Sequence, residues 1–294
     1  MQKIENKPCV EKISSTALFV SYARRYSDIP YAGKFPVPEE SQEIYERMME
    51  QNIAGAGFLT ILYEARYKNL RKVLREIMEN ENIHNIIEIA SGSSSHGLEE
   101  SENSDIIYVE TDLPDMISEK EEKCTEILHN RKEERRNLYF ASVNALKKEE
   151  MLATLNLVSE DGPIMVTNEG LLSYFDNEDK AKIAKNIKAI VEKRGGVWVT
   201  ADTCVRFPPP SDIDMKTIFR GLAKTTERKI REKAFVSIEE SIAFFEDFGF
   251  EVERRLYDMS DLRSVSLFQE TGVNVDAIIE NMSHREIFIL RLKK

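Results

Sequence analysis

Two short apolar stretches constrain the fold of this chain more than any other feature. Residues 86–89 read Ile-Ile-Glu-Ile and run into Ala90-Ser91-Gly92, whereas residues 106–109 run into a segment that contains Glu110 and Asp112. Both stretches have the length and composition of a buried β-strand. In a nucleoside-binding α/β domain, small residues after the first strand let the ligand approach the backbone, and a carboxylate after the second strand holds the ribose hydroxyls. The two stretches therefore predict a nucleoside site.

Beyond residue 86 the sequence alternates between apolar, strand-like segments and segments with helical periodicity. Further strands are expected at 138–140, 164–167 and 197–201, and helices at 113–130, 147–155, 177–193, 214–233 and 238–247. Alternation of this kind is typical of a parallel, doubly wound sheet with helices on both faces.

The end of the chain departs from this alternation. The last two expected strands, at 250–253 and 287–292, are joined by a long segment in which no regular crossover helix is expected. Parallel neighbours need a crossover connection, so an antiparallel pair at the sheet edge is expected. The predicted fold class is α/β, with a Rossmann-like seven-stranded sheet of the methyltransferase type that is mostly parallel and has an antiparallel C-terminal strand.

The residues before the first strand keep helical periodicity, with a break at Pro36-Val37-Pro38. They predict a helical N-terminal extension that caps the sheet and helps to bind substrate. The chain is therefore divided into a helical cap over residues 1–80 and a nucleoside-binding domain over residues 81–294, which forms one compact unit.

Composition excludes several classes of protein. The chain carries 52 acidic and 41 basic residues, a net charge of −11, which repels nucleic-acid phosphates. Three distant cysteines and four scattered histidines indicate neither a disulfide framework nor a metal site. No apolar run approaches the roughly 20 residues that span a bilayer, and residues 1–12 lack the apolar core of a signal peptide. We expect a cytoplasmic protein without a bulk nucleic-acid, membrane or metal partner, and the oligomeric state stays open.

A third apolar segment, at 164–167, runs into Asn168-Glu169-Gly170-Leu171-Leu172-Ser173-Tyr174. With this segment the chain resembles the leucine carboxyl methyltransferase family, whose bacterial members often read strand-Glu-Gly-Leu-Leu-x-Tyr here. The family also carries Asp-Leu-Pro followed by a lysine helix, as in Asp112-Leu113-Pro114 and Lys120. Ser15-Thr16-Ala17 near the N-terminus fits as well, so the resemblance covers nearly the whole chain.

The resemblance implies an O-methyltransferase that uses S-adenosylmethionine as its cofactor. It places Arg66 at the cofactor's carboxylate, a role suited to a planar two-pronged donor. It places Asp112 under the ribose and Glu169 beside the amino-acid end. Each position has an alternative: Arg66 could be a surface helix arginine, Asp112 and Glu169 could cap the helices that follow them, and Glu110 competes for the ribose.

Residues that follow the strands complete the site that the resemblance implies. Ala90 and Gly92 stand where the family has the first and the next glycine of its cofactor loop. Ser142 and Val143 stand at the adenine edge, where an acid is common in the family. Tyr174 is the candidate catalytic residue, and packing in the core is its alternative role.

The expected acceptor is a small molecule or a peptide terminus that is methylated on a carboxyl or hydroxyl oxygen. A carboxylate is already ionised at neutral pH and needs no general base. A hydroxyl would need one, and Glu169, Tyr174 and His96 are the candidates, although His96 is expected on a solvent-exposed loop. Arg206 and Arg220 are candidates to pair with an acidic acceptor.

Two other functions stay open at the level of sequence. One is a nicotinamide-dependent oxidoreductase on a doubly wound fold, although the loop at 90–95 lacks the second and third glycines of the dinucleotide fingerprint. The other is a non-catalytic protein that binds S-adenosylmethionine as a sensor.

Overall fold

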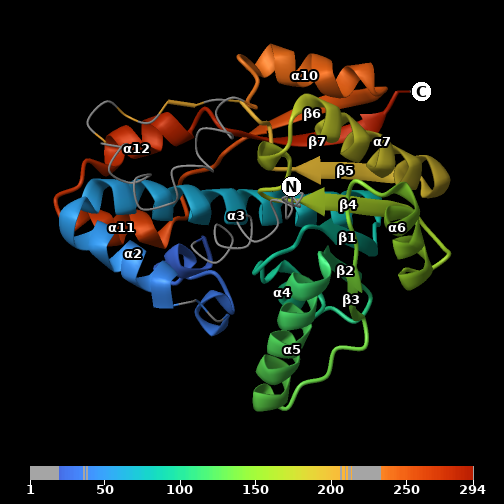
Figure 1. Ribbon diagram of the computed structural model, residues 1–294, viewed down its shortest axis with the longest axis horizontal. Helices are drawn as coiled ribbons and strands as arrows, with labels where there is room; N and C mark the ends of the chain where they lie inside the picture. Colours follow the sequence, from blue (N-terminus) through green and yellow to red (C-terminus); the bar gives the residue numbers. More distant parts are fainter. Residues whose placement is uncertain are drawn as a thin grey trace, which may run out of the picture.

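A seven-stranded β-sheet forms the centre of the molecule in the computed structural model, which describes residues 20–35, 37, 39–205, 207, 208, 210, 213 and 233–293 (Figure 1). The strands are β1 (Asn85–Ile89), β2 (Ile107–Asp112), β3 (Leu138–Ser142), β4 (Ile164–Asn168), β5 (Gly196–Thr200), β6 (Phe250–Leu256) and β7 (Glu286–Leu292). Their order is β3-β2-β1-β4-β5-β7-β6. The strands β1 to β5 pair in parallel, and β7 is antiparallel to both β5 and β6. The predicted sheet, mostly parallel with an antiparallel C-terminal strand, is confirmed.

Helices cover both faces of this sheet. The α-helices are α2 (Glu39–Gln51), α3 (Ile53–Glu81), α4 (His96–Glu100), α5 (Pro114–Arg131), α6 (Lys148–Ala153), α7 (Asn177–Arg194), α10 (Ile238–Asp247), α11 (Arg263–Gln269) and α12 (Val275–Met282). Single 3₁₀ turns form η1 (Ala32–Lys34), η2 (Thr154–Leu157) and η3 (Leu172–Tyr174). Residues 20–24 are also helical, within the N-terminal extension that is expected to be helical.

Successive residues of each strand enter two different apolar layers. Ile86 belongs to the apolar layer that includes side chains of α3 and α5, whereas the adjacent Ile87 belongs to the layer that includes side chains of α7 and α10. Side chains of a strand alternate between the two faces of its sheet, and here both faces are covered. This explains why the inner strands read as continuous apolar runs rather than as alternating ones.

The connection between β6 and β7 differs from the expectation. It contains the helices α11 and α12, which pack against α3 rather than crossing the sheet. Glu64 of α3 holds the first turn of α11, because its carboxylate accepts the backbone N–H groups of Arg263 (3.0 Å) and Ser264 (2.8 Å). The segment that connects β6 and β7 leaves the sheet and returns to it at the same edge, so β7 still runs antiparallel to β6.

The parallel strands end on the side of the sheet where the N-terminal helices lie. Figure 1 shows the arrowheads of β4 and β5 pointing toward the side that holds α2, α11 and α12. Ligands of open α/β sheets bind at this carboxyl edge. The division at residues 80 and 81 stays a prediction, although α3 shares one apolar layer with the sheet.

Some expectations fall on residues that the structure does not describe. They include most of the helix expected at 214–233, the Ser15-Thr16-Ala17 segment, and both Arg206 and Arg220. Within the described part of the chain, every helix is too short or too polar to cross a bilayer.

Candidate functional site

The loop after β1 makes a tight turn against the end of β2. Ala90 (φ 55°) and Gly92 (φ 47°) both adopt left-handed backbone conformations, which glycine accepts without strain and alanine does not. The turn lets Ser91 donate its N–H to the Thr111 carbonyl (2.8 Å) and lets Gly92 donate its N–H to the Asp112 carboxylate (2.8 Å). Ala90 therefore adopts a backbone geometry that favours glycine, at the position where the resemblance implies a glycine.

Asp112 lies at the carboxyl end of β2, half-buried and paired in register with Ser142 of β3. Its second carboxylate oxygen accepts the N–H of Leu113 (2.7 Å), and its carbonyl accepts the N–H of Val143 (2.8 Å). Burial raises the pKa of Asp112 above its ordinary value. Each carboxylate oxygen has two acceptor positions, so holding the loop leaves capacity for hydroxyl donors.

Asp112 is not the N-cap of the following helix, because α5 has Leu113 in that position and no side chain caps it. The competing candidate, Glu110, is fully buried and forms an ion pair with Lys120. It also lies directly against Gly97, where an added Cβ would come within 2.1 Å of its carboxylate. Glu110 is therefore enclosed in the interior and unavailable to a ribose.

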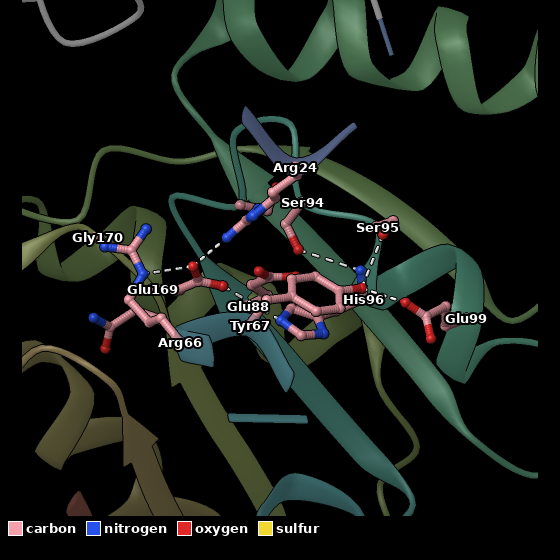
Figure 2. A network of polar contacts seen from close by, with 12 residues as sticks. Arg24, Arg66, Tyr67, Glu88, Ser94, Ser95, His96, Glu99, Glu169 and Gly170 are labelled. Atoms are coloured by element: carbon pink, nitrogen blue, oxygen red, sulfur yellow. Dashed lines mark hydrogen bonds and ion pairs between the residues drawn. The ribbon is translucent and has the colours of Figure 1, made fainter. Parts of the chain in front are cut away.

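Glu169 follows β4 and is the centre of a buried ion cluster, shown in Figure 2. Its carboxylate pairs with Arg24 from the N-terminal helical segment and with Arg66 from α3, whose Nε lies 2.7 Å away. The Glu169 side chain is only 3% exposed and the Arg66 side chain 19%. Arg66 is therefore not a surface arginine, and the structure brings it together with Glu169 at one end of the site.

His96 belongs to this cluster, which corrects the expectation of a solvent-exposed loop histidine. It is fully buried at the start of α4, and its Nε2 lies 3.5 Å from a carboxylate oxygen of Glu169. Its ring stacks on Tyr67 of α3 with centroids 3.9 Å apart, and Figure 2 shows the two rings together. The sequence signal that could have placed His96 in the cluster is its position directly after the small-residue loop at 90–95.

The cluster controls the charge of Glu169. Burial by itself would raise the pKa of this carboxyl, but the Arg24 and Arg66 charges, with His96, hold the pKa well below its ordinary value. Burial would likewise lower the pKa of Arg66, and the carboxylates of Glu169 and Asp202 raise it instead. Both groups are therefore ionised at neutral pH.

Asp202, which follows β5, organises the loop after β4 and was missed in the sequence. Its carboxylate accepts three successive backbone N–H groups, those of Gly170 (2.8 Å), Leu171 (2.6 Å) and Leu172 (2.9 Å). Asp202 therefore holds the start of the η3 turn, a role proposed above for Glu169. An acid directly after a predicted strand was the available signal.

Tyr174 ends the same loop and is half-buried. Its carbonyl accepts a hydrogen bond from Lys233 (2.6 Å). The loop places Tyr174 near the carboxyl edge of the sheet, and its catalytic role stays a prediction.

Comparison with known proteins adds information about the fold. No protein-family model matches the chain, and neither does any curated protein sequence. A DUF574 family protein from Streptomyces avermitilis has 11% sequence identity and a TM-score of 0.58, over 95% of this chain and 97% of that one. A protein from Thermobifida fusca, provisionally described as a methyltransferase, has 14% identity and a TM-score of 0.55, over 99% and 100%. These likenesses confirm the Rossmann-like methyltransferase fold.

Proposed function

We propose that this chain is an S-adenosylmethionine-dependent methyltransferase that acts on an oxygen atom. The observation that carries the proposal is the placement of two carboxylates, those of Asp112 and Glu169, at the ends of the strands on either side of β1. Asp112 stands at the end of β2 and Glu169 just past the end of β4, and β1 pairs with both strands. This is the point where strand order reverses and where nucleotides bind in open α/β sheets.

The two ends match the two ends of S-adenosylmethionine. Asp112 offers acceptors for ribose hydroxyls beside a turn whose backbone is open to close approach. At the other end, the second carboxylate oxygen of Glu169 is buried and makes no hydrogen bond with the described residues, with His96 Nε2 facing it at 3.5 Å, and this oxygen suits an ammonium group. Arg66 suits the cofactor's carboxylate, and Arg24 would keep Glu169 paired when Arg66 turns toward that carboxylate.

The cofactor, when bound, supplies a methyl group already activated by its sulfonium. The work left to the chain is to align the acceptor oxygen and exclude water. A carboxylate acceptor needs no proton removed, which suits a cluster in which Glu169 is already held by two guanidinium groups. We propose a carboxyl or hydroxyl oxygen of a small molecule or peptide terminus as the acceptor, in keeping with the leucine carboxyl methyltransferase resemblance.

Titration calorimetry tests the cofactor assignment. S-adenosylmethionine should bind the wild-type protein and NAD should not. Asp112→Ala and Arg66→Ala should each weaken binding about 10- to 100-fold, because each removes charge-assisted hydrogen bonds of about 1.5–3 kcal/mol. The control is Asp105→Ala, which removes an exposed acid just ahead of β2. This variant should bind S-adenosylmethionine as tightly as the wild type.

Unchanged affinity in both site variants would contradict the assignment, as would tight binding of NAD alone. An assay for S-adenosylhomocysteine over a panel of carboxyl and hydroxyl acceptors then separates an enzyme from a sensor. Turnover with any acceptor supports the enzyme, and cofactor binding without turnover over the whole panel would favour the sensor.

A further inference from the structure

The sheet edge continues past the proposed cofactor site to a second group of polar and aromatic residues. Because β7 is antiparallel, its first residues lie at the same edge as the last residues of β5 and β6. Tyr257 follows β6 and Arg285 precedes β7, and the two are joined by the Tyr257 N–H and the Arg285 carbonyl (2.9 Å). This edge lies on the β5 side of Glu169.

Arg285 is a half-buried arginine whose guanidinium lacks a carboxylate partner among the described residues. Its Nε is buried and makes no hydrogen bond with any residue that the structure describes. The contrast with Arg24 and Arg66 is direct, since both of those pair with Glu169. A buried charge is tolerated when it is paired, so the buried part of this guanidinium suits an anion.

An aromatic ring lies over this guanidinium, since the centre of the Phe207 ring is 4.9 Å from its carbon atom. Tyr257 is hydrogen-bonded to the Arg285 backbone. Burial raises the pKa of both Tyr63 and Tyr257, and the Arg285 charge acts to lower it. Burial lowers the pKa of Arg285 and the nearby charge of Arg66 adds to that effect. The nearby carboxylates are engaged elsewhere, Glu169 by Arg66 and Asp202 by the backbone N–H groups of the loop after β4.

We propose that Arg285 binds a carboxylate of the methyl acceptor, while Phe207, Tyr63 and Tyr257 hold the flat apolar body that carries it. The inference rests on the proposed methyltransferase function, because it assigns the acceptor side of that same site. Arg66 connects the proposed cofactor side with the proposed acceptor side. It pairs with Glu169, and its guanidinium carbon lies 5.4 Å from the centroid of the Tyr63 ring. An acceptor held by Arg285 would lie next to the donor.

The test compares benzoate with benzamide, its neutral counterpart of the same shape, by NMR titration of the whole protein. Titrations are made with and without saturating S-adenosylhomocysteine, which engages Arg66 and leaves Arg285 open. Benzoate should bind about tenfold more tightly than benzamide, the effect of one charge-assisted contact. The Arg285→Gln variant should lose this preference, and Arg285→Lys should keep part of it.

Arg136→Gln is the matched control, because it removes the same charge from an arginine that is 86% exposed. It should keep the full preference for benzoate. Equal binding of benzoate and benzamide to the wild-type protein would overturn the proposal without any variant. An undiminished preference in a folded Arg285→Gln variant would overturn it as well. Failure to bind S-adenosylhomocysteine would instead count against the proposed function, and the titrations without it would still decide whether Arg285 binds acids.

Discussion

The two ends of the candidate cofactor site are built in opposite ways. At the ribose end, Asp112 and Gly92 are 20 residues apart, and backbone N–H groups of adjacent strands and loops make the contacts. At the amino-acid end, Glu169 meets Arg66 across 103 residues and Arg24 across 145. Local chain geometry therefore shapes the first end, whereas buried side-chain charges from three distant segments shape the second.

The difference teaches where the fold and the function depend on each other. The ribose end can lose its carboxylate and keep its strands, because ladder hydrogen bonds and the apolar layers hold them. At the amino-acid end, the same charges that suit a ligand also fix the N-terminal helical segment and α3 to the sheet. Changes there should affect stability as well as binding.

Removing Glu169 should produce the largest effect. Glu169→Ala leaves Arg24 and Arg66 buried without their partner, so the free energy of unfolding should fall by about 3–5 kcal/mol. Asp112→Ala should cost less, about 1–3 kcal/mol, since it leaves two backbone N–H groups without their acceptor. Denaturant unfolding of both variants measures the two values. An equal or larger loss in Asp112→Ala would break the comparison between the two ends.

Acid should affect the two ends in opposite directions. The pKa of Glu169 is lowered by folding, so its contribution to stability is complete above its unfolded pKa of about 4.3 and is lost as the pH falls below that value. The pKa of Asp112 is raised by folding, so protonation on acidification favours the folded state. Denaturant unfolding of the wild type, Glu169→Gln and Asp112→Asn from neutral pH downward measures both effects.

With falling pH, the stability advantage of the wild type over Glu169→Gln should shrink, and that over Asp112→Asn should grow. Parallel curves for the two variants would contradict the opposite pKa shifts.

The smallest effect is expected at Ala90. Its left-handed backbone costs an alanine about 1–2 kcal/mol, whereas glycine adds about 0.4–1 kcal/mol of unfolded-chain entropy. Ala90→Gly should therefore raise the free energy of unfolding by about 0.5 kcal/mol, measured as a higher melting temperature. Ala141→Gly in β3, outside the left-handed positions, should lower it. A lower melting temperature in Ala90→Gly would show that the turn is not strained.

The contact between Asp112 and Gly92 was easier to predict than the ion cluster around Glu169, for a physical reason. Apolar runs mark the strands, and parallel neighbours bring their carboxyl ends together, so local pattern places the ends of β1 and β2 side by side, although it left Glu110 and Asp112 as alternatives. The burial of His96 depends on Tyr67 in a distant helix, and nothing near His96 in the chain reports that contact. Asp202 could be seen after its strand, but its loop partners lie some 30 residues earlier.

The C-terminal region was predicted in outline only. The antiparallel β7 followed from the long connection before it, whereas α11 and α12 did not, because they are short and owe their positions to packing on α3. The resemblance placed Arg66 beside the cofactor's tail, and the structure puts it against Glu169. Arg285 carried no local signal, since a lone arginine in a charged sequence is ordinary.

One helix connects the proposed acceptor side with the proposed cofactor side. Tyr63, Arg66 and Tyr67 lie on one face of α3 at helical spacing; Tyr63 lies under the Arg66 guanidinium, Arg66 pairs with Glu169, and Tyr67 stacks on His96. A continuous rod of 29 residues cannot move one of these without carrying the others. If the proposed acceptor side is right, homologous chains could change the acceptor by altering the segments around Tyr257 and Arg285, while α3 keeps Arg66 and Tyr67 at the ion cluster.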